Sequence, residues 1–137
     1  MSEFSGKVVI VTGSSSGIGE AIALRLGELG ASVVVNSANS VEAGKAVAAK
    51  IGANAIYVQA DISDKDAGQH LLDETIKNFG KLDILINNAG WTSLVAHHDL
   101  EALTDEIFQK TFAVNVWGTW ALTKAAMPLL KKSDDGN

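Results

Sequence analysis

The 137-residue chain is 47% hydrophobic and 20% charged, which is enough apolar content for one folded domain and too much for a disordered chain. Its net charge of −5 offers no basic surface for nucleic acid, and the lack of cysteine excludes disulfides, thiolate metal ligands and a cysteine nucleophile. No signal sequence and no apolar run of about 20 residues is present, so we expect a cytoplasmic protein that is not embedded in a membrane.

Short runs rich in β-branched residues predict four strands, at Lys7–Thr12, Ser32–Asn36, Asn54–Gln59 and Leu82–Asn87. The first, second and fourth have nearly continuous apolar cores. Strands of a parallel sheet show this pattern when helices cover both faces.

Helical periodicity fills the intervals between these runs. The predicted helices cover Ile18–Leu29, Ser40–Ile51, a segment from Ser63 to Phe79, and a longer segment from Thr104 to about Met127. Ser63 and Asp66 have the spacing of a capping box at the start of the third helix. The alternation predicts an α/β fold, a Rossmann-like doubly wound parallel sheet with about four strands and four helices, in one domain over residues 1–137. The polar end, Lys131–Asn137, predicts a turn toward another strand.

A glycine-rich loop, TGSSSGIG at Thr12–Gly19, follows the first strand and opens the first helix. Gly13 permits a sharp turn, Gly17 permits close backbone approach to a diphosphate, and Gly19 permits close packing of helix on sheet. The start of a helix offers free N–H groups and a positive dipole to phosphates. A glycine turn without a ligand is the alternative. A phosphotransfer loop is disfavoured because no Lys-Ser/Thr pair follows Gly19.

Two further polar turns follow the third and fourth strands, at Asp61-Ile62 and at Asn87–Gly90. Both are expected at the same sheet edge as the glycine loop, where open α/β sheets bind ligands. Asp61 could accept a hydrogen bond from an adenine amino group, or could simply cap a helix. Asn87 and Asn88 could tie loop backbones together, while small Ala89 and Gly90 leave room for a ring.

These signals, TGSSSGIG, Asp61-Ile62, LDILINNAG at Leu82–Gly90 and Asn115 in NVWG, together resemble the short-chain dehydrogenase/reductase family. The resemblance covers essentially the whole chain. It implies a dinucleotide site with the diphosphate at Gly13, Gly17, Ile18 and Gly19 and with Ser14 and Ser16 nearby. It also implies adenine contacts from Asp61 and Ile62, ribose contacts from Asn87, Ala89 and Gly90, and a water in the proton relay held by Asn115.

The same resemblance implies a serine and a Tyr-x-x-x-Lys pair that this chain does not contain. The single tyrosine, Tyr57, is followed at the fourth position by Asp61 and is predicted to pack in a strand. We therefore expect the N-terminal, cofactor-binding half of an NAD(P)-dependent oxidoreductase, inactive by itself, that interconverts a carbonyl and an alcohol. A catalytically inactive nucleotide-binding module is the alternative.

The turn after the second strand bears on the choice between NAD and NADP. NAD sites commonly place an acid on the ribose 2′-hydroxyl about 20 residues after the glycines, but Asn36–Ser40 holds none. A neutral turn at Asn36 and Ser37 can accept a 2′-phosphate that a carboxylate would repel. The sequence therefore favours NADP, although this turn has no lysine or arginine to bind the phosphate.

Remaining aromatic and histidine residues are assigned weaker roles. Trp117 and Trp120 share a face of the fourth helix, where they could pack in a core or, as the resemblance implies, join a partner helix in a homo-oligomer. Trp91 could edge the cofactor pocket or pack beneath its loop. Adjacent His97 and His98 lack metal-ligand spacing and predict a solvated loop rather than a metal site.

Overall fold

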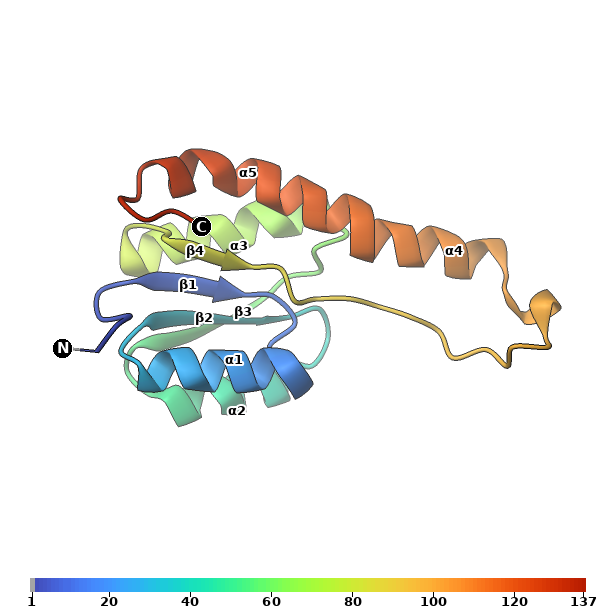
Figure 1. The fold of residues 1–137 in the computed structure, drawn as a ribbon, viewed down its shortest axis with the longest axis horizontal. Coiled ribbons are helices and arrows are strands. Elements are labelled where there is room, and N and C mark those ends of the chain that lie inside the picture. Colours follow the sequence, from blue (N-terminus) through green and yellow to red (C-terminus); the bar gives the residue numbers. More distant parts are fainter. Residues whose placement is uncertain (1) are drawn as a thin grey trace.

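The computed structural model describes residues 2–137 and contains a four-stranded parallel sheet covered by helices on both faces (Figure 1). The first seven elements alternate between strand and helix along the chain. They are β1 (Val8–Val11), α1 (Gly17–Glu28), β2 (Ser32–Ser37), α2 (Val41–Ile51), β3 (Ala55–Gln59), α3 (Lys65–Phe79) and β4 (Ile84–Ile86). The strands lie in the order β3-β2-β1-β4. The predicted doubly wound parallel sheet is confirmed, with strand ends within two residues of those expected.

The central strands are apolar on both sides because each side of the sheet is covered. Val9 and Val33 belong to the core under α1 and α2, whereas Ile10 and Val34 belong to the core under α3 and the last helix. Neighbouring residues of one strand point to opposite faces, so a strand covered twice needs an uninterrupted apolar run. Figure 1 shows α1 and α2 together on one face of the sheet and α3 on the other.

The chain after β4 forms a long loop and then one continuous helical rod. The loop contains a short 3₁₀ turn, η1 (Leu100–Ala102), and the rod consists of α4 (Asp105–Phe112), the π-helical segment η2 (Ala113–Gly118) and α5 (Thr119–Lys131). The rod extends past the predicted end near Met127 and contains Pro128 inside α5. Figure 1 shows α5 beside α3 and α4 projecting beyond the sheet. The π-helical segment was not predicted.

The helix that follows β3 is capped one residue later than the sequence pattern suggested. The carboxylate of Asp64 accepts hydrogen bonds from the N–H groups of Asp66 at 2.9 Å and Ala67 at 3.3 Å. Ser63 instead donates its hydroxyl to Asp61 at 2.7 Å. Asp64 therefore satisfies the free N–H groups of the first turn, and the expected capping box at Ser63 is wrong.

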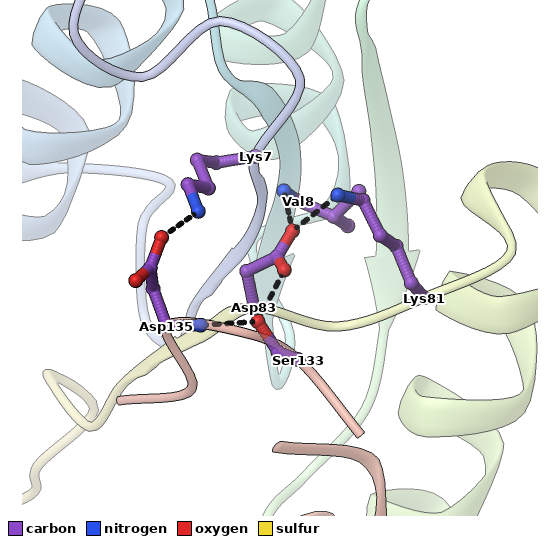
Figure 2. Close-up of polar contacts among 6 residues, drawn as sticks. All are labelled: Lys7, Val8, Lys81, Asp83, Ser133 and Asp135. Carbon is purple, nitrogen blue, oxygen red and sulfur yellow. Dashed lines mark hydrogen bonds and ion pairs between the residues drawn. The ribbon is translucent and has the colours of Figure 1, made fainter. Parts of the chain in front are cut away.

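A cluster of charged and polar side chains lies at the end of the sheet where the strands begin (Figure 2). The buried carboxylate of Asp83 accepts hydrogen bonds from the Val8 N–H at 2.8 Å, the Lys81 ammonium at 3.1 Å and the Ser133 hydroxyl at 2.5 Å. Lys7 forms an ion pair with Asp135 beside it. The cluster therefore joins the C-terminal turn to β1 and to the start of β4.

Two opposing effects set the pKa of Asp83. Burial raises this pKa, but the hydrogen bonds from Ser133, Val8 and Lys81 and the positive charge of Lys81 together hold it below its ordinary value of 3.8. The carboxylate is therefore ionised at neutral pH and receives three hydrogen bonds.

The C-terminal turn leads back to the sheet, as its polar sequence predicted. The N–H of Asn137 donates to the carbonyl of Asp83, and the Asn137 carbonyl accepts from the N–H of Leu85, both at 2.9 Å. This is the hydrogen-bond pattern of parallel strands, so Asn137 lies beside β4 at the edge away from β1.

Candidate functional site

A cleft of about 350 Å³ lies at the edge of the sheet where the strands end. The loops after all four strands contribute to its walls, together with the beginning of the helical rod. The expectation that the glycine loop, the Asp61 turn and the Asn87–Gly90 turn share one edge is confirmed. The lining residues are Gly13, Ser15, Ser16, Asn36, Ser37, Ala38, Asn39, Ser40, Ala60, Asp61, Ile62, Asn88, Ala89, Gly90, Trp91, Lys110 and Val114.

The glycine loop brings α1 close to the turn after β4. A Cβ atom on Gly13 would lie 2.8 Å from the Cα of Ala89, and one on Gly19 would lie 2.4 Å from the Nδ2 atom of Asn88. Gly13 also has a φ of +62°, a region that other residues rarely adopt. These two glycines are therefore required by backbone shape and by packing between adjacent loops.

Gly17 has a different role, because a Cβ atom there would meet nothing within 4 Å. Its φ of +59° turns the chain into α1. Ser16, at the N-cap position, makes no side-chain capping bond, in contrast to Asp64 on α3 and Thr104 on α4. The start of α1 thus combines open space with N–H groups that no side chain caps, which is the arrangement that anions require.

Two polar residues predicted to serve the cofactor form hydrogen bonds within the protein framework. Ser14 is fully buried; its hydroxyl donates to the Val11 carbonyl at 2.7 Å and accepts from the Asn36 N–H at 3.0 Å. The Asn36 amide donates to the carbonyls of Val58 and Ala60, each at 3.1 Å, and accepts from the Gly13 N–H at 3.2 Å. Asn36 therefore ties the ends of β1, β2 and β3 together.

The neighbouring positions also make internal hydrogen bonds. The Ser37 hydroxyl lies 2.6 Å from the phenol oxygen of Tyr57, which packs against α2 as expected for a strand aromatic. One oxygen of Asp61 accepts from both the N–H and the hydroxyl of Ser63. Asp61 lines the cleft with its remaining oxygen free of any such bond to the described residues.

The turn after β4 is fixed by Thr12, whose role the sequence did not reveal, and by Asn88, which ties loop backbones together as the sequence suggested. The Thr12 hydroxyl accepts from the N–H groups of Asn88 at 3.0 Å and Ala89 at 2.9 Å. The Asn88 amide donates to the carbonyls of Thr12 and Gly13. A threonine at the end of β1 was the available signal, because its hydroxyl can bond loop backbone. Asn87 points elsewhere, donating to Thr123 of α5 at 3.0 Å.

Asn115 lies in the π-helical segment, and its side chain forms hydrogen bonds with both backbone polar groups of Trp91. Its side chain accepts from the Trp91 N–H at 2.7 Å and donates to the Trp91 carbonyl at 2.8 Å. The ammonium of Lys110 lies 4.3 Å from the centre of the Trp91 ring. Trp91 therefore lines the edge of the cleft, which is one of the two interpretations that the sequence left open for it. Lys110 also lines the cleft, which the sequence did not predict.

Some of the residues predicted to serve the site line the cleft, and others do not. Gly13, Ser16, Asn36, Ser37, Asp61, Ile62, Ala89 and Gly90 line it, whereas Ser14, Gly17, Ile18, Gly19, Asn87 and Asn115 do not. Gly17 and Ile18 lie at the start of α1 beside it, and the Ile18 side chain is 75% exposed. His97 and His98 are exposed in the loop after β4, away from the cleft lining.

The residues present suit a dinucleotide. The open start of α1 fits a diphosphate, the small residues Ala89 and Gly90 leave space beside it, and the cleft continues to Asp61 and Ile62. Fold and cleft together define a Rossmann-type α/β protein with an open cleft at the carboxyl ends of its strands. Within residues 2–137, no helix has both the length and the apolar character needed to cross a membrane.

Comparison with known proteins identifies the family. The short chain dehydrogenase family model matches residues 7–137, and the chain belongs to that family. The chain is 48% identical over 130 residues to a protein named as ketoacyl reductase 2 of the granaticin polyketide synthase in Streptomyces violaceoruber, covering 95% of this chain and 52% of that protein. It is 46% identical over 124 residues to versicolorin reductase 1 of Aspergillus parasiticus, covering 88% and 46%.

Solved structures agree with this assignment. The chain superposes with a TM-score of 0.88 and 35% identity on a 3-ketoacyl-(acyl-carrier-protein) reductase from Brucella melitensis complexed with NADH, covering 93% of this chain and 51% of that one. It superposes with a TM-score of 0.86 and 40% identity on a Burkholderia cenocepacia short chain dehydrogenase in complex with NADP, covering 93% and 52%. The chain thus spans about half the length of the relatives it matches.

Proposed function

We propose that the protein is an NAD(P)-dependent oxidoreductase that interconverts a carbonyl and an alcohol, and that this chain supplies its cofactor-binding half. The observation that carries the proposal is the open start of α1 at one end of a cleft built from the ends of all four strands. Family membership and the nucleotide-bound relatives support it. The bound nicotinamide would supply the hydride chemistry.

The chain's own residues bind and orient the cofactor in this proposal. N–H groups of Gly17, Ile18 and Gly19 would hold the diphosphate, with Ser15 and Ser16 beside it. Asp61 and Ile62 would contact adenine, while Ala89 and Gly90 would border the ribose. The buried network of Ser14 and Asn36 would act indirectly, because it fixes the positions from which the loops reach the ligand.

Asn115 keeps its proposed place in the proton relay, and its contacts give it a positioning role as well. Both polar atoms of its side chain bond the Trp91 backbone, so Asn115 sets the direction in which the chain leaves Gly90. A water in the relay would bind to side-chain or backbone polar groups of Asn115 that can form a further hydrogen bond.

We infer that NADP is the preferred cofactor. Supporting this, the cleft wall after β2 is formed by Ser37, Ala38, Asn39 and Ser40, without an acid that would repel a 2′-phosphate. Ser40 makes no side-chain cap on α2, so the start of that helix also keeps uncapped N–H groups at the cleft. Isothermal titration of the full-length protein with NADPH and NADH tests this. A preference for NADH of tenfold or more, equivalent to about 1.4 kcal/mol of binding free energy, would overturn the inference that NADP is preferred.

The same titration tests the proposed function. Binding of either nucleotide is expected, and a crystal soaked with it should show the diphosphate at the start of α1. A ligand lodged elsewhere would refute the site. Nucleotide binding without turnover of any carbonyl or alcohol would instead favour a nucleotide-binding module.

We further infer that the protein forms homo-oligomers through the helical rod. Phe112, Trp117 and Trp120 are each more than half exposed along the rod. A row of exposed aromatic side chains on a helix is typical of a surface that packs against another protein.

A further inference from the structure

The charges that line the cleft are few. Among the described residues, its lining carries one carboxylate, Asp61, and one cation, Lys110. A nicotinamide dinucleotide is an anion, because its phosphates are ionised at neutral pH, and the chain itself has a net charge of −5. Without Lys110, the side chains of the cleft would present only a negative charge to an anionic ligand, and Coulomb repulsion would weaken its binding.

The side chain of Lys110 contacts the indole of Trp91. Its ammonium lies 4.3 Å from the centre of the Trp91 ring, a contact that favours the conformation in which Lys110 faces the indole. Trp91 in turn is held through both backbone polar groups by Asn115. A lysine whose rotamers are already restricted loses less side-chain entropy when it binds a ligand.

The ammonium of Lys110 also remains available. Within residues 2–137, Lys7, Lys45, Lys50, Lys77 and Lys81 each form an ion pair with a carboxylate, whereas no carboxylate in that range pairs with Lys110. An ammonium group bears three donors, so contact with an aromatic face leaves capacity for a phosphate oxygen.

We propose that Lys110, aligned by Trp91, is a phosphate-binding residue for the dinucleotide. It supplies, from α4, a positive charge to a cleft whose other described lining residues carry none. Lysine binds phosphate as a point charge and needs no fixed fork geometry, which suits a group that reaches across a cleft. The inference rests on the proposed function, since it assumes a nicotinamide dinucleotide in this cleft.

Isothermal titration of the full-length protein with NADPH and with NADH tests the proposal. Lys110→Met should weaken the binding of at least one nucleotide by about tenfold, the loss of one charge-assisted hydrogen bond. It should also flatten the dependence of affinity on salt. Lys124→Met on α5 removes the same charge away from the cleft and should leave affinity unchanged.

Comparing the affinity losses for NADPH and NADH identifies which phosphate Lys110 binds. A larger loss for NADPH than for NADH assigns Lys110 to the 2′-phosphate, and equal losses assign it to the diphosphate. If wild-type protein binds both nucleotides and Lys110→Met binds them as tightly as Lys124→Met does, the proposal is overturned. If wild-type protein binds neither, the proposed function fails and this inference fails with it.

A second pair of variants tests the alignment by Trp91. Trp91→Leu should weaken the same nucleotide by a smaller factor than Lys110→Met, and Trp91→Phe should restore most of the affinity because a ring is retained. Equal affinity in Trp91→Leu and wild-type protein would show that Lys110 acts without alignment by the indole.

Discussion

Replacing Asp83 by alanine should lower the free energy of unfolding by about 2–4 kcal/mol, because it removes the acceptor of a buried N–H and of two further donors. The Asp83 side chain is 3% exposed and receives hydrogen bonds from Val8, Lys81 and Ser133. Alanine would leave the buried Val8 N–H without its acceptor, which costs about 1–3 kcal/mol by itself. The remaining loss comes from the charge-assisted bond of Lys81 and from the freed turn at Ser133.

Urea-induced unfolding of the full-length protein, followed by circular dichroism, measures this change. Ser133→Ala is the matched control within the cluster, because it removes one donor and leaves the carboxylate with two; it should cost about 1 kcal/mol. Lys124→Met, an exposed substitution outside the cluster, should stay within about 0.5 kcal/mol of wild type. The reasoning is refuted if Asp83→Ala destabilises the protein no more than Ser133→Ala does.

Three further outcomes are expected. Because the pKa of Asp83 in the folded protein lies below 3.8, the stabilisation from its carboxylate is present above that value and is lost as pH falls through the folded pKa. The difference in unfolding free energy between wild type and Asp83→Asn should therefore shrink as pH falls below 3.8, and growth of that difference would contradict this expectation. Gly19→Ala places a Cβ atom 2.4 Å from Asn88 and should cost about 1–3 kcal/mol in thermal denaturation, with weaker NADPH binding; an unchanged melting temperature would argue against the close packing. Trp120→Asp, at a site 59% exposed, should convert oligomers to monomers in sedimentation velocity, and unchanged assembly would exclude this face.

Much of the fold could be predicted because its signals are local. Runs such as Lys7–Thr12 are apolar on both faces, which occurs in covered parallel strands, and the glycine loop directly after that run marks the turn into α1. The order of strands along the sheet edge then placed the polar turns near one another. These inferences need only residue spacing and the rule that parallel strands end at the same edge.

The errors involve choices between neighbouring residues that local pattern does not distinguish. Ser63 and Asp64 can both cap a helix, and the structure uses Asp64 because the Ser63 hydroxyl bonds Asp61. Ser14 looks like a loop serine in the sequence. In the structure it is buried, and its hydroxyl accepts a hydrogen bond from the N–H of Asn36, 22 positions later, which no local pattern indicates.

The features that sequence reasoning missed depend on contacts between distant segments. Lys110 reaches the cleft because the helical rod runs back beside the turn that contains Gly90. Asp83 lies inside a predicted strand, where alternation alone gives no reason to expect a buried carboxylate. Its partner Ser133 is 50 positions away, so the spacing of residues offers no signal for this pair.

The π-helical segment Ala113–Gly118 has a consequence for how the rod tolerates insertions and deletions. A π segment holds one residue more than the α-helical turns it replaces, and each residue turns an α-helix by about 100°. Deleting one residue there should make the rod uniformly α-helical with its outer part in the same orientation relative to α5, because the extra residue is the one removed. Deleting one residue from a regular α-helical turn of the rod would instead rotate the outer part by about 100° and carry Lys110 away from the indole. The core contacts of Leu122 and Ala126 in α5 would persist in both cases, so the segment lets the rod lose a residue without displacing Lys110.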